Sequence, residues 1–324
     1  MRDLDDREHR RLAVVAEAFL DRALPDLLDW LSEALPEVTA LELGSGGYAP
    51  TPHCNRSALL ADQRARQRWL AEIQGRGFSV VALNAWGNPL HPDTQIAAHH
   101  DRDLRDTIRL ASALGVDRVV ALAGCPAASS EDQTPYFAAG GWLPYLESVY
   151  DEQWERRVAP YWSSMSDFAR ATDPDLLICL ELHPGTAVYN VETFNRLAGL
   201  GENLAATVDP SHFFWQQMDT QAVLDSIRAR VGHVHAKDVV YNDEVLARQG
   251  LLDHRWAGST GQGPWRFATV GAGHDAGWWN RFMNALDGSA VRAIAIEHED
   301  LSVPAEIGVP EAARLLMSAV EVTA

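Results

Sequence analysis

Four short apolar runs in the second half of the chain each end on a side chain that binds hard divalent metals. LLICLE ends at Glu181, LAATVD at Asp209, VGHVH at His235 and AIAIE at Glu297. Apolar runs of this length are typical of buried strands. In a parallel α/β barrel, the C-terminal ends of all strands lie on one face, where active sites are found. Three carboxylates and one imidazole delivered in this way predict a divalent-metal site.

The predicted donor set favours particular metals and a particular chemistry. Sites rich in carboxylates with one imidazole bind Mn²⁺, Mg²⁺ or Co²⁺ more readily than they bind a structural zinc ion. Of these metals we expect Mn²⁺. Such a metal polarises a substrate carbonyl and acidifies the adjacent C–H, so that a nearby base can remove the proton. Glu181 and Glu297 are then expected to act as a pair, one removing and the other returning a proton.

Three further polar side chains follow the same strand ends. His183, two residues after Glu181, is either a catalytic base or substrate contact, or a histidine that orients Glu181. His212 lies in VDPSH, where Pro210 turns the chain, and we expect it near the site as a catalytic residue. Lys237 in HVHAKD either hydrogen-bonds a substrate hydroxyl or developing enolate, or belongs to a salt-bridged loop.

Other candidate substrate contacts lie in loops. In NAWGNPLHP, the side chains of Asn84, Trp86 and Asn88 suit a polyhydroxylated ring; the alternative is a Gly-Pro turn capped by Asn88. In WRFATVGAGHD, we expect Arg266 and His274 to reach the site from a lid.

The elements that position these residues follow a β-α-β period. Helical spacing is found at Pro25–Leu35, Ser57–Gln74 and His100–Leu114, and the first strand has one long N-terminal helix as its alternative. We expect one domain over residues 1–324, a (β/α)8 TIM barrel with its core at about 11–310. Eight segments are predicted to be strands: Arg11–Phe19, Val38–Leu43, Phe78–Leu83, Asp117–Leu122, Leu176–Glu181, Leu204–Asp209, Val231–His235 and Arg292–Glu297.

Two long segments interrupt the repeat. Gly124–Tyr161 and Val239–Gly277 follow strands and are expected as long loops over the C-terminal face.

The composition of the chain limits which partners it can bind. The formal charge of -18 disfavours binding to nucleic acid and to acidic membranes. The charged N-terminus lacks an apolar h-region, and no stretch reaches the roughly 18 apolar residues of a membrane span, so we expect a cytoplasmic protein.

The motifs resemble those of a known superfamily. ELHPG, VDPSH, HVHAKD and IEHED are similar to motifs of the sugar phosphate isomerase/epimerase superfamily, the xylose isomerase-like barrels, over roughly Arg11 to Pro310. The resemblance implies metal ligation by the four strand-end residues, with the two glutamates as the acid/base pair. It thus implies a sugar isomerase or epimerase, and barrels of this kind often form homo-oligomers.

One motif also points to another reaction. The placement of His183 in ELH resembles the catalytic subunit of bacterial C-glycoside deglycosidases, in which a histidine is the implied base acting on a 3-keto-glycoside. That reading implies a lyase that works with a small partner subunit. A non-catalytic sugar-binding barrel is a third hypothesis, which the complete ligand set disfavours. An AP endonuclease would need more metal-binding histidines and a DNA-compatible surface.

Overall fold

The strands close into a barrel. The computed structural model describes residues 10–48, 50–140, 143–252 and 263–321. Among these residues, eight parallel strands follow one another around the barrel in the order β1-β10-β7-β6-β5-β4-β3-β2. The predicted fold class, an α/β TIM barrel, is therefore confirmed. The barrel strands are β1 (Arg11–Val15), β2 (Val38–Gly47), β3 (Ser79–Trp86), β4 (Arg118–Leu122), β5 (Leu177–Glu181), β6 (Leu204–Val208), β7 (Val231–Ala236) and β10 (Ala293–Ile296).

Helical segments connect the strands. The α-helices are α1 (Leu24–Ala34), α2 (Arg56–Ala61), α3 (Gln63–Gly75), α4 (Thr94–Leu114), α5 (Pro144–Gln153), α6 (Ala159–Thr172), α7 (Val191–Ala198), α8 (Pro210–Phe214), α9 (Thr220–Ile227), α10 (Asp243–Gln249), α11 (Ala276–Ala285) and α12 (Ala305–Glu321). Shorter turns are η2 (Ala16–Phe19), η3 (Ala138–Gly140), η4 (Trp154–Val158) and η5 (Arg228–Arg230). No helix in the described ranges is long and apolar enough to cross a membrane.

Local sequence signals explain where the elements begin and end. Asp93 caps α4, because its carboxylate accepts hydrogen bonds from the backbone N–H groups of Gln95 and Ile96. Gly115 ends this helix with a φ of 72°, a left-handed conformation that glycine adopts readily. Between these ends, residues such as Leu104 and Ile108 repeat at helical spacing and are buried.

Several predicted boundaries were wrong. The first strand ends at Val15 and continues as the single turn η2. β2 runs past its predicted end at Leu43, as far as Gly47. The helix predicted at Ser57–Gln74 is two helices, which separate at Asp62.

The two long segments contain regular structure. Gly124–Tyr161 includes α5 and the π-helical turn η4, which continues into α6. In Val239–Gly277, β8 (Asp238–Tyr241) pairs antiparallel with β9 (Trp265–Ala268). Residues 253–262 of that segment lie outside the described part of the chain. The expectation of long loops is thus wrong for the parts of both segments that these elements occupy.

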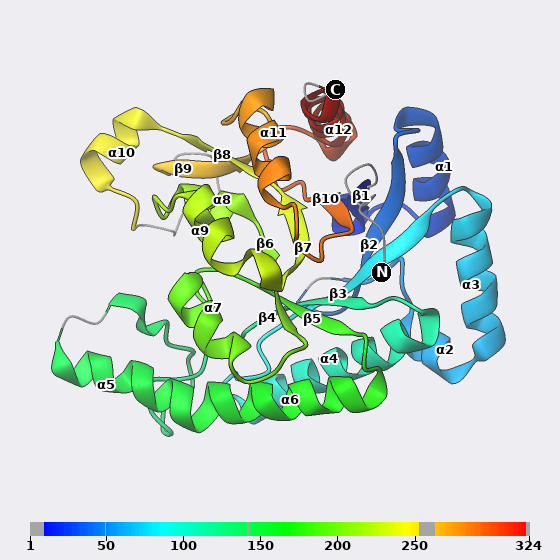
Figure 1. Cartoon of the computed structure of the whole chain (residues 1–324). Coiled ribbons are helices and arrows are strands. Elements are labelled where there is room, and N and C mark those ends of the chain that lie inside the picture. Colours follow the sequence, from blue (N-terminus) through cyan, green and yellow to red (C-terminus); the bar gives the residue numbers. More distant parts are fainter. Residues whose placement is uncertain (1–9, 49, 141–142, 253–262, 322–324) are drawn as a thin grey trace. The chain divides into compact units, whose positions relative to one another are not determined.

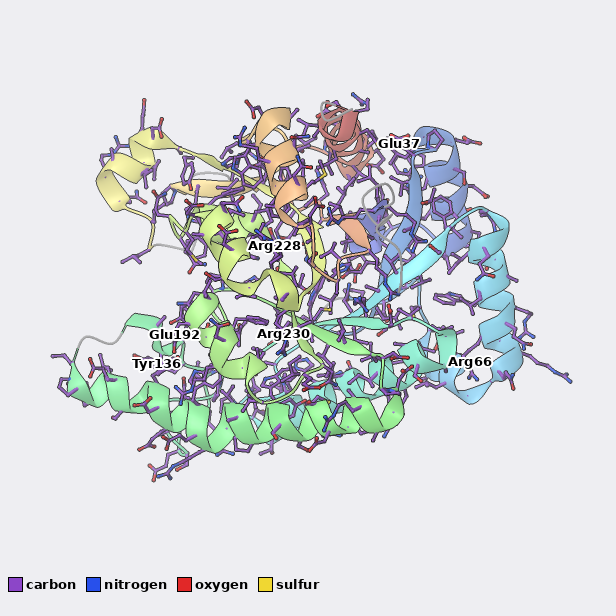
Figure 2. All side chains as sticks on the ribbon, in the orientation of Figure 1. Glu37, Arg66, Tyr136, Glu192, Arg228 and Arg230 are labelled. Atoms are coloured by element: carbon purple, nitrogen blue, oxygen red, sulfur yellow. The ribbon has the colours of Figure 1, made fainter. Side chains whose placement is uncertain are left out.

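The chain contacts divide into two compact units. The first unit comprises Met1–Glu42, Ile73–Ser79 and Val208–Ala324, and the second comprises Leu43–Glu72 and Val80–Thr207. In the first unit, α11 and α12 pack against each other, and in the second α4 packs against α6 (Figure 1). Side chains fill the space between helices and strands in each unit (Figure 2). The single-domain assignment stays a prediction.

Candidate active site

Three of the four predicted metal ligands converge within the first unit. Asp209 follows β6, His235 lies in β7 and Glu297 follows β10. One ligand atom from each lies within 4.8 Å of the others. The β10–β7 register, with Ala295 opposite His235, brings Glu297 beside β7, where its N–H donates to the Ala236 carbonyl. All three side chains are buried, so oxygen and imidazole donors face one another away from solvent.

Asp209 owes its orientation to a helix start. Its Oδ1 accepts a hydrogen bond of 2.9 Å from the Ser211 N–H and so caps α8, with Pro210 in the first helical position. The other oxygen, Oδ2, faces the Lys237 ammonium at 3.0 Å and His212 Nε2 at 3.5 Å. The cap therefore fixes one oxygen of Asp209 and directs the other into the candidate site.

Glu42 in β2 is a buried site residue that was not predicted from the sequence. Its Oε2 lies 2.6 Å from His233 Nε2 and 3.2 Å from His235 Nε2. Burial raises the pKa of Glu42, but the two imidazoles outweigh burial and hold the pKa well below its usual value. An acidic residue inside the apolar run VTALEL was the available signal. His233 is the hydrogen-bonded interior histidine that its place in β7 suggests.

Lys237 is the cation of the candidate site. Its Nζ lies 2.7 Å from Glu297 Oε2, 2.9 Å from Glu299 Oε2 and 3.0 Å from Asp209 Oδ2. The ammonium also lies 4.5 Å from the centre of the Phe267 ring. Lys237 thus forms salt bridges, which is one of the two alternatives stated for it, and two of its partners, Asp209 and Glu297, are predicted metal ligands. Its contact with substrate stays a prediction.

His212 lies beside the predicted ligand Asp209. Its imidazole is 1% exposed and packs edge-on against Phe267 with ring centres 5.5 Å apart. The expected position near the site is therefore found within the first unit. A catalytic role for His212 stays a prediction.

Asp238 organises the loop that carries His274. Its Oδ2 accepts hydrogen bonds from the N–H groups of Gly271, Gly273 and His274, and its Oδ1 lies 2.7 Å from His274 Nδ1. A Cβ at Gly273 would lie 2.0 Å from the Val239 carbonyl oxygen, so glycine is needed for this close approach. His274 also stacks on Phe214 at 3.8 Å. These contacts fix the position of His274 in the loop, and its contact with substrate stays a prediction.

Replacing Asp238 by Asn is expected to lower the free energy of unfolding by about 3 kcal/mol. The change leaves backbone N–H donors facing an amide in a buried site, and hydrogen bonds to a charged acceptor are worth more than neutral ones. Urea unfolding would measure this loss. Asp275→Asn is the matched control, because Asp275 caps α11 from an exposed position and should lose about 1 kcal/mol or less. Equal losses would contradict the organising role of Asp238.

Arg266 pairs with a buried carboxylate. Its Nη1 lies 2.7 Å from Oδ1 of Asp300, and Asp300 Oδ2 accepts from the Thr269 N–H at 2.9 Å. Burial raises the pKa of Asp300, but hydrogen bonds from Ser302 and Thr269 and the Arg266 charge lower it overall below its usual value. The guanidinium expected in a lid therefore joins β9 to the loop after β10, and a substrate contact by Arg266 stays a prediction.

This lowered pKa gives a pH-dependent stability. A carboxyl whose pKa is lower in the folded protein than in the unfolded chain stabilises the fold above the unfolded pKa. That contribution is lost as the pH falls through the folded pKa. We expect the unfolding free energy to decrease between about pH 5 and pH 3, and to decrease less in Asp300→Asn. Urea titrations at pH 3, 4, 5 and 7 test this, and parallel curves for both proteins would refute it.

Two predicted residues lie at the end of β5 in the second unit. Glu181 is the last residue of the strand, and its side chain is buried. His183 lies in the turn that follows, with Nδ1 2.6 Å from the Pro184 carbonyl oxygen. Because a carbonyl can only accept, Nδ1 carries the hydrogen, which leaves Nε2 as the nitrogen able to accept a proton in a neutral ring. The ligand role of Glu181 stays a prediction.

The remaining candidates lie at the end of β3 in the second unit. Asn84 is buried and Trp86 is half-buried. The Asn88 Oδ1 accepts from the N–H groups of Leu90 and Cys125, and its Nδ2 donates to the Cys125 carbonyl. Asn88 thus caps the turn, which is the alternative given above to a substrate contact. It also joins the loops after β3 and β4. Substrate contacts by these three residues stay predictions.

Comparison with known proteins places this chain in a family. A family model described as a xylose isomerase-like TIM barrel matches residues 39–319. YfiH of Bacillus subtilis (strain 168) is 30% identical over 304 residues, covering 92% of this chain and 96% of YfiH. Inosose dehydratase of Serratia proteamaculans (strain 568) is 30% identical over 108 residues, covering 32% of this chain and 34% of that protein.

Solved structures agree on the fold. L-ribulose 3-epimerase has a TM-score of 0.60 at 13% identity, covering 97% of this chain and 95% of that chain. The family match confirms the resemblance of the motifs to those of the xylose isomerase-like barrels. The chain therefore belongs to the family of xylose isomerase-like TIM barrels.

Proposed function

We propose that this protein is a divalent-metal-dependent sugar isomerase or epimerase that removes a proton next to the carbonyl of a ketose or polyol-derived ketone. The observation that carries the proposal is the buried donor set of Asp209, His235 and Glu297. Carboxylate oxygens and one imidazole nitrogen fit Mn²⁺ best, with Mg²⁺ and Co²⁺ as alternatives. When bound, such an ion would polarise the substrate carbonyl and acidify the neighbouring C–H.

Glu181 is proposed as the fourth ligand. β5, β6, β7 and β10 are successive strands in the barrel order, and the proposed ligands follow or end these strands. In parallel barrels the C-terminal ends of the strands form the catalytic face. This topology supports Glu181 as the residue that completes the set.

The chain's own residues would move the protons. Glu181 and Glu297 would act as a pair, one taking a proton from the substrate carbon and the other returning one. Lys237 lies 2.7 Å from Glu297 and is suited to stabilise negative charge that develops on a substrate oxygen. His212 would hydrogen-bond a substrate hydroxyl. We expect a neutral sugar, because the sequence offers no evident basic or glycine-rich phosphate cradle.

A lyase is the second candidate, and the turn at His183 favours it. With Nδ1 held by the Pro184 carbonyl, Nε2 can accept a proton from the carbon next to a ketone. The electron pair left on that carbon then forms a C=C bond, while the group on the next carbon departs with its bonding pair and takes up a proton. The similarity to an inosose dehydratase supports elimination. A 3-keto-glycoside would be the substrate, with a small partner subunit.

Deuterium exchange separates these candidates. The Mn²⁺-loaded protein would be incubated in D₂O with ketoses, inososes and 3-keto-glycosides, and NMR would follow deuterium incorporation and products. Deuterium next to the carbonyl with the carbon skeleton retained is the expected result. Release of an aglycone or of water would establish the lyase. No exchange with any compound, with metal bound, would refute both and favour a non-catalytic sugar-binding barrel.

A further inference from the structure

Glu42 joins two histidines of one strand. His233 and His235 are two residues apart in β7, so their side chains lie on the same face of the strand. A single oxygen of Glu42, Oε2, faces the Nε2 atom of both rings, at 2.6 Å and 3.2 Å. Glu42 and His235 are 0% exposed and His233 is 2% exposed. The three side chains thus form a buried hydrogen-bonded group within the first unit.

The chemistry of this contact fixes the hydrogen on His235. An ionised carboxylate only accepts hydrogen bonds, so a neutral His235 ring that bonds to Glu42 through Nε2 carries its hydrogen there. Its Nδ1 is then the nitrogen with a lone pair. That atom lies 3.4 Å from Glu297 Oε2, on the side of the proposed metal ligands. The contact with Glu42 therefore selects the tautomer that a metal needs.

We propose that Glu42 is a positioning residue that holds His235 in the tautomer and orientation required for metal binding through Nδ1. This inference rests on the proposed function and extends it to a residue that does not itself contact the metal. His233 has an indirect part, because its shorter contact holds the carboxylate in place. Carboxylates that accept the second N–H of a metal-binding histidine orient the ring in this way.

The same three side chains suggest one competing arrangement. Ligand atoms of Glu42, His233 and His235 lie within 4.8 Å of one another, so the group itself is a candidate metal site. A metal there would need a lone pair on Nε2 of each histidine, which is the opposite tautomer. The position of the His235 hydrogen therefore distinguishes the two arrangements, and so does the number of metal ions bound per chain.

The test measures the tautomer of His235 and the affinity of the chain for Zn²⁺, and it needs no substrate. Long-range ¹H–¹⁵N NMR on the ¹⁵N-histidine-labelled, metal-free chain should show His235 with its hydrogen on Nε2. Glu42→Gln should lose this single tautomer and bind Zn²⁺, used as the probe ion, about 10–100-fold more weakly by competition with a fluorescent chelator. His233→Gln should weaken binding by a smaller factor, because the bond between Glu42 and His235 remains.

Matched variants keep the result interpretable. Glu42→Asp retains the charge on a shorter side chain and should retain more affinity than Glu42→Gln. Asp103→Asn removes another buried carboxylate, which pairs with Arg56, and should leave the tautomer and the Zn²⁺ affinity unchanged. Thermal unfolding of each variant would verify that it is folded.

Specific outcomes would overturn the inference. Hydrogen on Nδ1 of His235 in the unchanged chain would do so, and so would equal Zn²⁺ affinity in Glu42→Gln. Two Zn²⁺ ions per chain, with one lost in that variant, would assign the group as a metal site instead. Because these readouts need no turnover, the expected tautomer and affinities without any deuterium exchange would retain the role of Glu42 and reject the isomerase.

Discussion

Replacing Glu297 by Gln is expected to lower kcat about 10³-fold with metal bound. General acid–base groups contribute about 10²–10⁴-fold, and glutamine keeps the shape of the side chain while losing the basic carboxylate. The rate of deuterium exchange would be measured at saturating Mn²⁺. Metal content would be determined on the same samples, because Glu297 is also a proposed ligand.

Glu299→Gln is the matched control for this change. Glu299 also contacts the Lys237 ammonium, at 2.9 Å, but its side chain is 49% exposed and is not part of the donor set. We expect the control to lose less than about 10-fold in kcat, since exposed ion pairs contribute little. A Glu297→Gln enzyme with full metal occupancy and unchanged kcat would remove Glu297 from the acid/base pair.

Replacing Lys237 by Met is expected to destabilise the metal-free protein by about 3–5 kcal/mol. The change leaves the buried carboxylates of Asp209 and Glu297 without their ammonium partner, and an uncompensated buried charge is costly. Added Mn²⁺ should raise Tm more in the variant than in the unchanged protein. The ion would then neutralise these carboxylates without having to displace the ammonium.

Thermal unfolding with EDTA and with Mn²⁺ checks this expectation. Arg22→Met is the control, because the Arg22–Glu306 pair is far more exposed than Lys237 and its loss should cost less than about 1 kcal/mol. If metal-free Lys237→Met were as stable as this control, Lys237 would not be the compensating charge of the site.

The positions of the strand-end residues can be predicted from the sequence because a parallel barrel converts strand order into proximity; their roles stay predictions. Asp209, His235 and Glu297 each follow or end an apolar run, and three ligand atoms converge as expected. Glu42 escaped prediction because it lies inside a strand, where an acidic residue is ordinarily assigned to a solvated face. Partners from a strand distant in sequence, His233 and His235, account for its burial.

Other errors have equally local causes. Gly46 and Gly47 resemble a turn, yet they continue β2, and a Cβ at Gly47 would lie 1.9 Å from the Trp86 carbonyl oxygen. The glycines therefore permit a close approach that composition alone does not reveal. Between α5 and α6, the π-helical turn shifts the spacing of apolar residues, so the helical period across this segment is not seen in the sequence.

Because of that π-helical turn, the hydrogen bonds from Gln153 to the loop after β4 depend on the number of residues between α5 and α6. Gln153 ends α5 just before the turn, and its Nε2 lies 2.8 Å from the carbonyl oxygen of Tyr136, labelled in Figure 2, and 3.2 Å from that of Pro126. A π-turn holds one residue more than a regular α-turn. Deleting the exposed Glu155 would convert the π-turn into a regular α-turn and leave the faces of α5 and α6 nearly in register. Inserting a further residue there would instead rotate α5 by about 100° relative to α6 and turn Gln153 away from both carbonyls. Single-residue insertions here thus act as changes of angle while a deletion is absorbed by the turn, and the loop after β4 would respond to an insertion more than to most substitutions on the same helix.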